Sequence, residues 1–145
     1  MNLRMTTRVA LVALLGFGAA PVKAAEDPLA ATLRKVVEDN AAAYSREDAA
    51  GTMASVAANS PDYETTKSLL ADQFAARDVK AELVDFKYIG HDDEFALARV
   101  KLKSAASPKD AGFADNTVDS IVVFHLDNGV WKLWSEDVLG VEVLP

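Results

Sequence analysis

Apolar residues first recur at helical spacing just after residue 26. Asp27-Pro28 offers an N-cap residue followed by a proline at the first helical position, where its missing N–H costs nothing. From there one apolar stripe continues for about four turns, as expected for a helix with one buried face. The stripe consists of Leu29, Leu33, Val36, Val37, Asn40, Ala41 and Tyr44.

Two further helices are predicted before residue 78. Asp48 can cap a short second helix that carries Met53 and Val56. Ser60 can cap a third helix, with Pro61 in its first turn. The buried stripe of this third helix is predicted to be Tyr63, Thr66, Leu70, Gln73 and Phe74.

After Asp78 the apolar period changes from 3.6 to 2, which indicates β-strands. Four strands are predicted, at about residues 80–89, 94–104, 117–126 and 130–144. Asn128-Gly129 predicts a type I′ hairpin turn, because both residues tolerate positive φ. Helices followed by hairpin-linked strands predict an α+β domain in which three helices pack on a four-stranded antiparallel meander.

The third predicted strand has apolar side chains on both faces. Val118, Val122, Phe124 and Leu126 point to one face, whereas Ile121 and Val123 point to the other. One face must contact the helices. The other is either the interface of a homodimer or an apolar surface of a monomer.

The N-terminus has the three parts of a secretory signal peptide. Arg4 and Arg8 precede the apolar run of residues 9–20, and Val22-Lys23-Ala24 places small or modest side chains at the positions that a signal peptidase reads. The apolar run is too short for a membrane anchor, which needs about 20 residues. We therefore expect cleavage after Ala24, a single domain over residues 25–145, and a periplasmic or secreted protein.

Charge and composition exclude several function classes. The formal net charge is −7, and it becomes more negative when the three basic residues of the signal peptide are removed. An acidic surface repels phosphate backbones and anionic lipids, so nucleic-acid and membrane-surface binding are not expected. The chain contains no cysteine, which excludes thiol catalysis and cysteine-ligated zinc. Neither a cofactor nor a metal site is predicted.

Four segments of the chain form a pattern that is typical of a known superfamily: Val36-Val37 through Tyr44, residues 47–51, residues 60–67, and Gly129-Val130-Trp131-Lys132-Leu133-Trp134. They resemble the nuclear transport factor 2-like (NTF2-like) superfamily, which includes ketosteroid isomerase, SnoaL-type polyketide cyclases and scytalone dehydratase. In order, the four segments span most of residues 28–143. The resemblance implies a curved, cone-shaped sheet whose concave face is roofed by helices and forms a pocket. This fold is shared by enzymes and non-enzymes.

The side chains predicted to reach such a pocket are Tyr44, Tyr63, Arg99, Asp119, His125 and Trp134. The isomerase and dehydratase members need a base and a hydrogen-bond donor inside the cone, and no cluster here matches their motifs position by position. Asp119 and His125 share a strand face but are separated by roughly 20 Å on a regular strand. A direct Asp–His pair is therefore not expected.

Two functions follow as hypotheses. The first is non-catalytic binding of a small apolar ligand or an envelope protein, with a homodimer formed through the outer sheet face. The alternative is an isomerase, cyclase or dehydratase with His125 or Asp119 as the base and a tyrosine as the donor. Arg99, Lys101 and Lys103 are interpreted as a solvated basic row, and the acidic turn at residues 91–94 as a turn and not a metal site.

Overall fold

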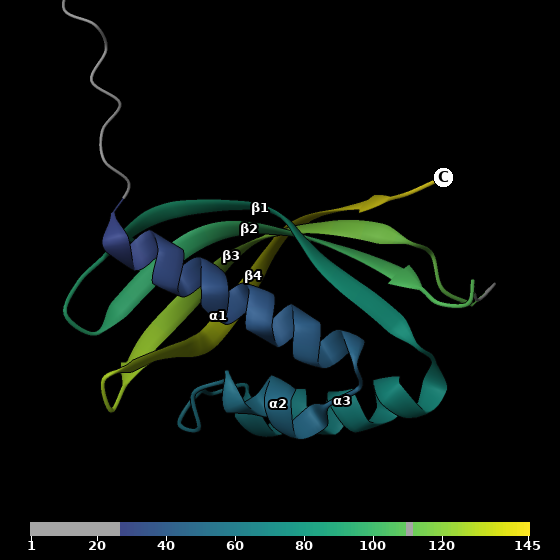
Figure 1. The fold of residues 1–145 in the computed structure, drawn as a ribbon, viewed down its shortest axis with the longest axis horizontal. Coiled ribbons are helices and arrows are strands. Elements are labelled where there is room, and N and C mark those ends of the chain that lie inside the picture. Colours follow the sequence, from purple (N-terminus) through teal and green to yellow (C-terminus); the bar gives the residue numbers. More distant parts are fainter. Residues whose placement is uncertain (1–26, 110–111) are drawn as a thin grey trace, which may run out of the picture.

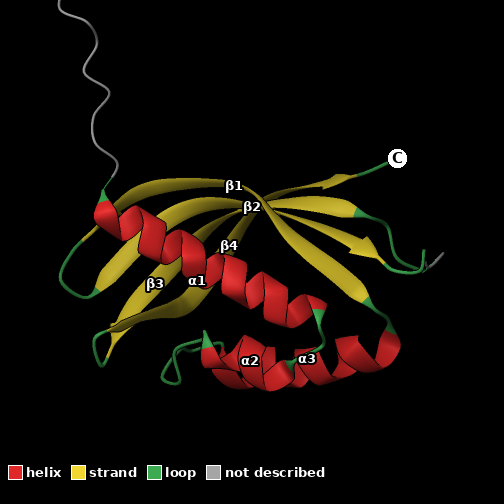
Figure 2. Ribbon diagram, viewed as in Figure 1, coloured by secondary structure: helices red, strands yellow, loops and turns green. Residues whose placement is uncertain are grey.

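A computed structural model describes residues 27–109 and 112–145, so the predicted signal peptide lies outside the described residues. The chain forms three helices followed by a four-stranded antiparallel sheet in the order β1-β2-β3-β4 (Figure 2). This arrangement confirms the predicted α+β fold. The elements are α1 (Pro28–Ser45), α2 (Ala49–Ala54), α3 (Tyr63–Ala76), β1 (Val79–His91), β2 (Phe95–Ala106), β3 (Asn116–Asp127) and β4 (Val130–Val143).

Helix α1 begins as the sequence predicts and lies across the concave face of the sheet (Figure 1). The Asp27 carboxylate accepts a hydrogen bond from the Leu29 amide at 2.9 Å, and Pro28 occupies the first turn. Leu33, Val37 and Ala41 of the predicted stripe are buried. Because this apolar stripe faces the sheet, α1 closes one side of the hydrophobic core.

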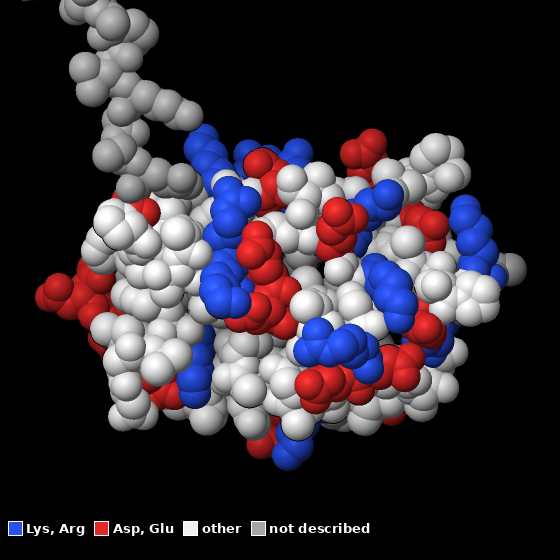
Figure 3. All heavy atoms as spheres, in the orientation of Figure 1, with Lys and Arg blue, Asp and Glu red and all other residues white. Residues whose placement is uncertain are grey.

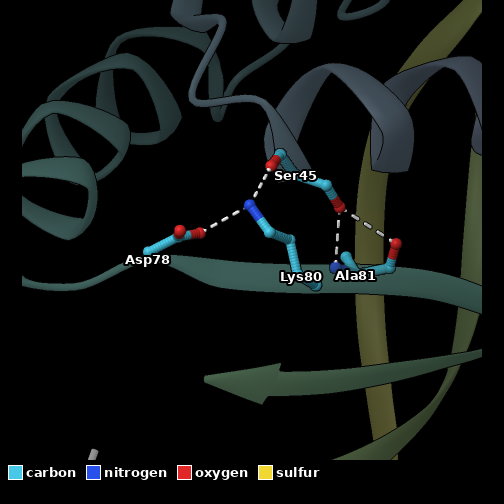
Figure 4. A network of polar contacts seen from close by, with 4 residues as sticks. All are labelled: Ser45, Asp78, Lys80 and Ala81. Carbon is cyan, nitrogen blue, oxygen red and sulfur yellow. Dashed lines mark hydrogen bonds and ion pairs between the residues drawn. The ribbon is translucent and has the colours of Figure 1, made fainter. Parts of the chain in front are cut away.

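The C-terminal end of α1 is tied to β1 by a polar network (Figure 4). Ser45 Oγ accepts from the Ala81 amide at 2.8 Å and donates to the Ala81 carbonyl at 3.1 Å. Lys80 Nζ donates to the Ser45 carbonyl at 2.8 Å and to Asp78 Oδ1 at 2.7 Å. These bonds occupy backbone groups at the end of the helix and on the edge strand, and so fix the angle between α1 and the sheet.

Helices α2 and α3 begin differently from each other. Asp48 caps α2 by accepting from the Gly51 amide at 2.8 Å, as predicted. Helix α3 begins at Tyr63, so the prediction that Ser60 caps this helix is wrong. Ser60 Oγ instead accepts from the Asp62 amide at 3.1 Å and donates to the Trp134 carbonyl at 2.5 Å. This tertiary hydrogen bond attaches the loop before α3 to strand β4.

The sheet has one face against the helices and an outer face that is turned away from them. Asn128 and Gly129 have φ of 51° and 80°, in agreement with the predicted type I′ turn between β3 and β4. Leu33 and Val37 from α1 pack with side chains from strands β1, β2 and β3 to form the main core. The strand members of this core are Phe86, Ala96, Ala98, Val100, Val122 and Phe124.

Two β-bulges interrupt the pairing of β3 with β4. One places Trp134 between Ser135, which pairs with Val123, and Leu133, which pairs with Phe124. A bulge bends the strand and shifts the alternation of side chains. Within residues 27–109 and 112–145, no helix is both long enough and apolar enough to cross a membrane.

Candidate functional site: a cavity between the helices and the sheet

A cavity of about 430 Å³ separates α3 from the concave face of the sheet. Figure 1 shows α2 and α3 side by side below α1, offset from the strands. The apolar wall includes Val37, Val56, Leu70, Val100, Val122 and Leu133. The volume lies within the range of small-molecule binding sites, about 300–1,000 Å³.

Two polar groups from α1 reach the cavity. Asn40 Nδ2 donates to the Thr52 carbonyl at 3.1 Å and to Ser55 Oγ at 2.7 Å, which satisfies both of its N–H groups. Asn40 Oδ1 therefore remains an available acceptor, since no donor in the described part of the chain bonds to it. The Tyr44 hydroxyl donates to Gln73 Oε1 at 3.1 Å. Burial raises the pKa of Tyr44, so the hydroxyl stays protonated at neutral pH.

The charged groups of the cavity are acidic. Asp62, just before α3, and Glu136, on β4, are exposed residues that line it. No lysine, arginine or histidine is among the described lining residues. Over the helices, by contrast, basic and acidic side chains are interspersed (Figure 3). The cavity thus combines an apolar wall with a rim that carries negative charge.

Of the six predicted pocket residues, the structure places Tyr44 and Trp134 at the cavity. Tyr63 packs against the small cluster of Met53, Val56 and Leu70, without being among the lining residues. The Trp134 carbonyl accepts from Ser60 at the cavity, while its indole ring packs against the ring of His125 at 4.7 Å.

His125 lies on the outer face of the sheet and not in the cavity. Its ring centroid is 5.0 Å from that of Phe95, its cross-strand partner. Nε2 is 3.3 Å from Glu94 Oε1, and Nδ1 is buried without a hydrogen-bond partner among the described residues. The histidine is therefore an aromatic packing residue beside a turn, and it is separated from the cavity by the sheet.

Asp119 is also on the outer face, where it pairs with two cations. Arg99 Nε and Nη2 donate to its two carboxylate oxygens at 2.8 and 2.6 Å, and Lys101 Nζ is 3.7 Å away. The Arg99 guanidinium lowers the pKa of Asp119 below its ordinary value of 3.8. The predicted basic row is thus neutralised in part by Asp119. Neither Asp119 nor His125, the candidate bases of the enzyme hypothesis, therefore faces the cavity.

The Arg99–Asp119 pair gives a pH-dependent prediction. Because the folded state lowers the pKa of Asp119, the pair contributes stability above the ordinary pKa and loses it as pH falls through the lowered value. We expect Asp119→Asn to reduce the free energy of unfolding at neutral pH, and this difference to shrink as pH falls below the ordinary pKa of 3.8. Urea denaturation across this range measures it. Asp137→Asn, a matched loss of charge on β4, is the control. A difference that is constant with pH would contradict the assignment.

In the acidic turn at residues 91–94, the Asp92 side chain stabilises the turn by accepting hydrogen bonds from backbone amides. Asp92 Oδ1 accepts from the Glu94 amide at 2.9 Å and from the Phe95 amide at 2.7 Å, and these bonds lower the pKa of Asp92. The Tyr88 hydroxyl contacts His91 Nδ1. Across the described ranges, no three His, Asp or Glu side chains are grouped as metal ligands.

Sequence comparison identifies the family. Residues 35–144 match the family model described as the C-terminal domain of anti-sigma-I factor RsgI9. The chain belongs to this family. No curated protein matches the chain significantly. The RsgI9 C-terminal domain family therefore provides the sequence-level classification of this protein.

Solved structures show that this family member has the NTF2-like fold. A cystatin-like protein of unknown function from Nostoc punctiforme aligns with a TM-score of 0.62 and 10% identity, covering 74% of this chain and 87% of that one. An NTF2-like protein of unknown function from Shewanella oneidensis gives 0.59 and 9%, covering 74% and 96%. A ketosteroid isomerase-like protein from Erwinia carotovora atroseptica gives 0.57 and 10%, covering 79% and 99%. The predicted NTF2-like fold is confirmed, and identities this low establish the fold alone.

Proposed function

We propose that this protein is a non-catalytic binding domain whose cavity takes up a small, mainly apolar ligand. The observation that carries the proposal is the cavity of about 430 Å³ between α3 and the sheet. A preformed apolar cavity with a few polar groups is the usual form of a small-molecule site. Burial of an apolar ligand there would release water from the aliphatic wall and favour binding.

The polar groups of the site favour binding over catalysis. Tyr44 is engaged with Gln73, and Asn40 with the backbone at Thr52 and with Ser55. The two residues predicted as bases, Asp119 and His125, lie on the other side of the sheet. The matching family is described as the C-terminal domain of an anti-sigma factor, a description that specifies no reaction.

Calorimetric titration with naphthalenemethanol, a neutral bicyclic alcohol, tests this proposal. Two fused rings fit within the cavity volume, and the hydroxyl can reach a polar group such as Asn40 Oδ1. We expect saturable binding of one molecule per chain with a negative heat-capacity change, the signature of apolar burial. Heats that match dilution at every temperature would contradict the proposal.

We also propose that two copies associate through the outer sheet face. Leu97 is 37% exposed there, opposite Val123 and beside Ile121, and the edge-to-face pair of Phe95 and Trp134 borders this area. Exposed apolar side chains that adjoin one another on a sheet are typical of an interaction surface.

Sedimentation and native mass spectrometry test the homodimer. We expect a dimer for the wild type and a monomer for Leu97→Glu, because two carboxylates would be buried at the centre of the interface. Val143→Glu, at an exposed position on β4 outside this surface, should leave the dimer intact. A wild-type protein that stays monomeric would contradict the proposal.

We further propose that the protein acts in the periplasm or outside the cell, after cleavage behind Ala24. The basic start, the short apolar run and the small residues before Ala25 support this. An envelope protein is then the expected kind of macromolecular partner. Intact-mass measurement of the protein recovered from the envelope or medium should give a chain that begins at Ala25, whereas an uncleaved cytoplasmic chain would contradict export.

A further inference from the structure

We infer that the cavity selects ligands with a cationic head group, so that its ligand class is a small apolar amine. This inference rests on the proposed binding function and adds the charge of the ligand. It depends on three features of the cavity: two carboxylates at its rim, the lack of a cation among its described lining residues, and an unused acceptor on its wall.

The two carboxylates come from segments that are joined at the cavity rim. Ser60 Oγ donates to the Trp134 carbonyl at 2.5 Å, which holds the loop before α3 against β4. Asp62 and Glu136 each follow two residues later along these segments, and both line the cavity. Glu136 pairs with Val122, whose side chain belongs to the core face, so its position on β4 faces the helices.

Neither carboxylate is committed to another role. Asp62 occupies the N-cap position of α3, but its side chain accepts no capping hydrogen bond. Glu136 makes no ion pair with any residue that the structure describes. Arg99 and Lys101, two cations of strand β2, lie on the opposite face and are engaged with Asp119. The negative charge at the cavity rim is therefore not neutralised from within the sheet.

The wall of the cavity adds to this preference. Asn40 lines the cavity and uses both N–H groups internally, and its carbonyl oxygen accepts no hydrogen bond from the described residues. An ammonium group has donors and no acceptor, and so matches acceptor groups and carboxylates. A carboxylate ligand has only acceptor oxygens, so it could not hydrogen-bond to these acceptor groups. Its negative charge would also be repelled by Asp62 and Glu136.

Three ligands with one ring system test the inference: naphthylmethylamine, naphthalenemethanol and naphthoate. At low salt we expect the ammonium to bind about tenfold more tightly than the alcohol, because each exposed ion pair adds only a modest gain. Naphthoate should bind most weakly. The ratio between ammonium and alcohol should approach one near 1 M salt, where the screening length falls to about 3 Å.

Substitutions then locate the preference. In Asp62→Asn combined with Glu136→Gln, the ratio of the two dissociation constants should fall below about twofold at low salt. Asp137→Asn removes the neighbouring charge, which pairs with Ile121 on the outer face, and should leave the ratio unchanged. The inference is wrong if naphthalenemethanol binds as tightly as naphthylmethylamine. It is also wrong if the double variant still binds the amine about tenfold more tightly than the alcohol. If none of the three ligands binds, the proposed function itself fails.

Discussion

Replacing Phe124 with alanine is expected to lower the free energy of unfolding by about 3–5 kcal/mol, the usual cost of removing a buried aromatic ring. Phe124 is fully buried at the centre of the main core and packs in the cluster that includes Leu33 of α1. Its cross-strand partner on β2 is Ala96, whose side chain cannot extend into the space left behind. The sheet is held by hydrogen bonds on both sides of β3, so a cavity will remain.

Guanidinium denaturation measures this effect, and Val123→Ala provides the comparison. Val123 is the neighbouring residue on β3, on the half-exposed outer face, so its truncation should cost clearly less, about 1 kcal/mol. A small domain has a total stability of about 5–15 kcal/mol, so Phe124→Ala should remove a large share of it. Equal losses for the two variants would contradict the assignment of the core to this face of the sheet.

Filling the cavity is expected to weaken ligand binding strongly. Thr66 lies on α3, is half-buried and lines the cavity. A tryptophan at this position would put a large ring into the space that the ligand needs, so Thr66→Trp should weaken binding of naphthalenemethanol more than tenfold, or about 1.4 kcal/mol. Calorimetric titration measures the loss.

Ser68→Trp is the matched control for this experiment. Ser68 is exposed on the same helix and is outside the cavity lining, so the same ring there should leave the affinity unchanged. Circular dichroism and thermal melts of both variants separate a filled cavity from an unfolded helix. Undiminished binding by a folded Thr66→Trp protein would place the ligand elsewhere.

The sequence predicts the order and type of the elements because local signals agree with the tertiary structure. Asp27 and Asp48 form the expected caps, and Asn128-Gly129 forms the expected turn. Each signal depends on neighbours within four residues. Ser60 is the exception, because its hydroxyl bonds to Trp134, which is 74 residues away. No local pattern contains that information.

The site is less predictable because both faces of β3 carry apolar residues. Alternation correctly places Asp119 and His125 on the same face as Ile121 and Val123. It does not say which face the helices cover, and the structure gives the helices the face of Phe124. Trp134 sits at a β-bulge, which interrupts alternation and has no simple sequence signal.

Apart from Tyr44, the sequence does not identify the polar residues of the cavity as site residues. Asn40 is a polar residue within the otherwise apolar stripe of α1. A polar residue at a buried position is the only sign in the sequence that it could belong to a site. Asp62 and Glu136 resemble any solvated acidic residues in an acidic chain. Their relation appears only when the bond between Ser60 and Trp134 brings the loop before α3 to β4.

The proposed ligand site lies between α3 and the concave face of the sheet. Intermolecular nuclear Overhauser effects between naphthalenemethanol and methyl-labelled protein can locate the bound ligand. We expect contacts to the methyl groups of Val56, Leu70 and Leu133, which line the cavity. Contacts to Leu97 and Val123 on the outer face instead, or a bound ligand without contacts to the cavity methyls, would contradict this location of the site.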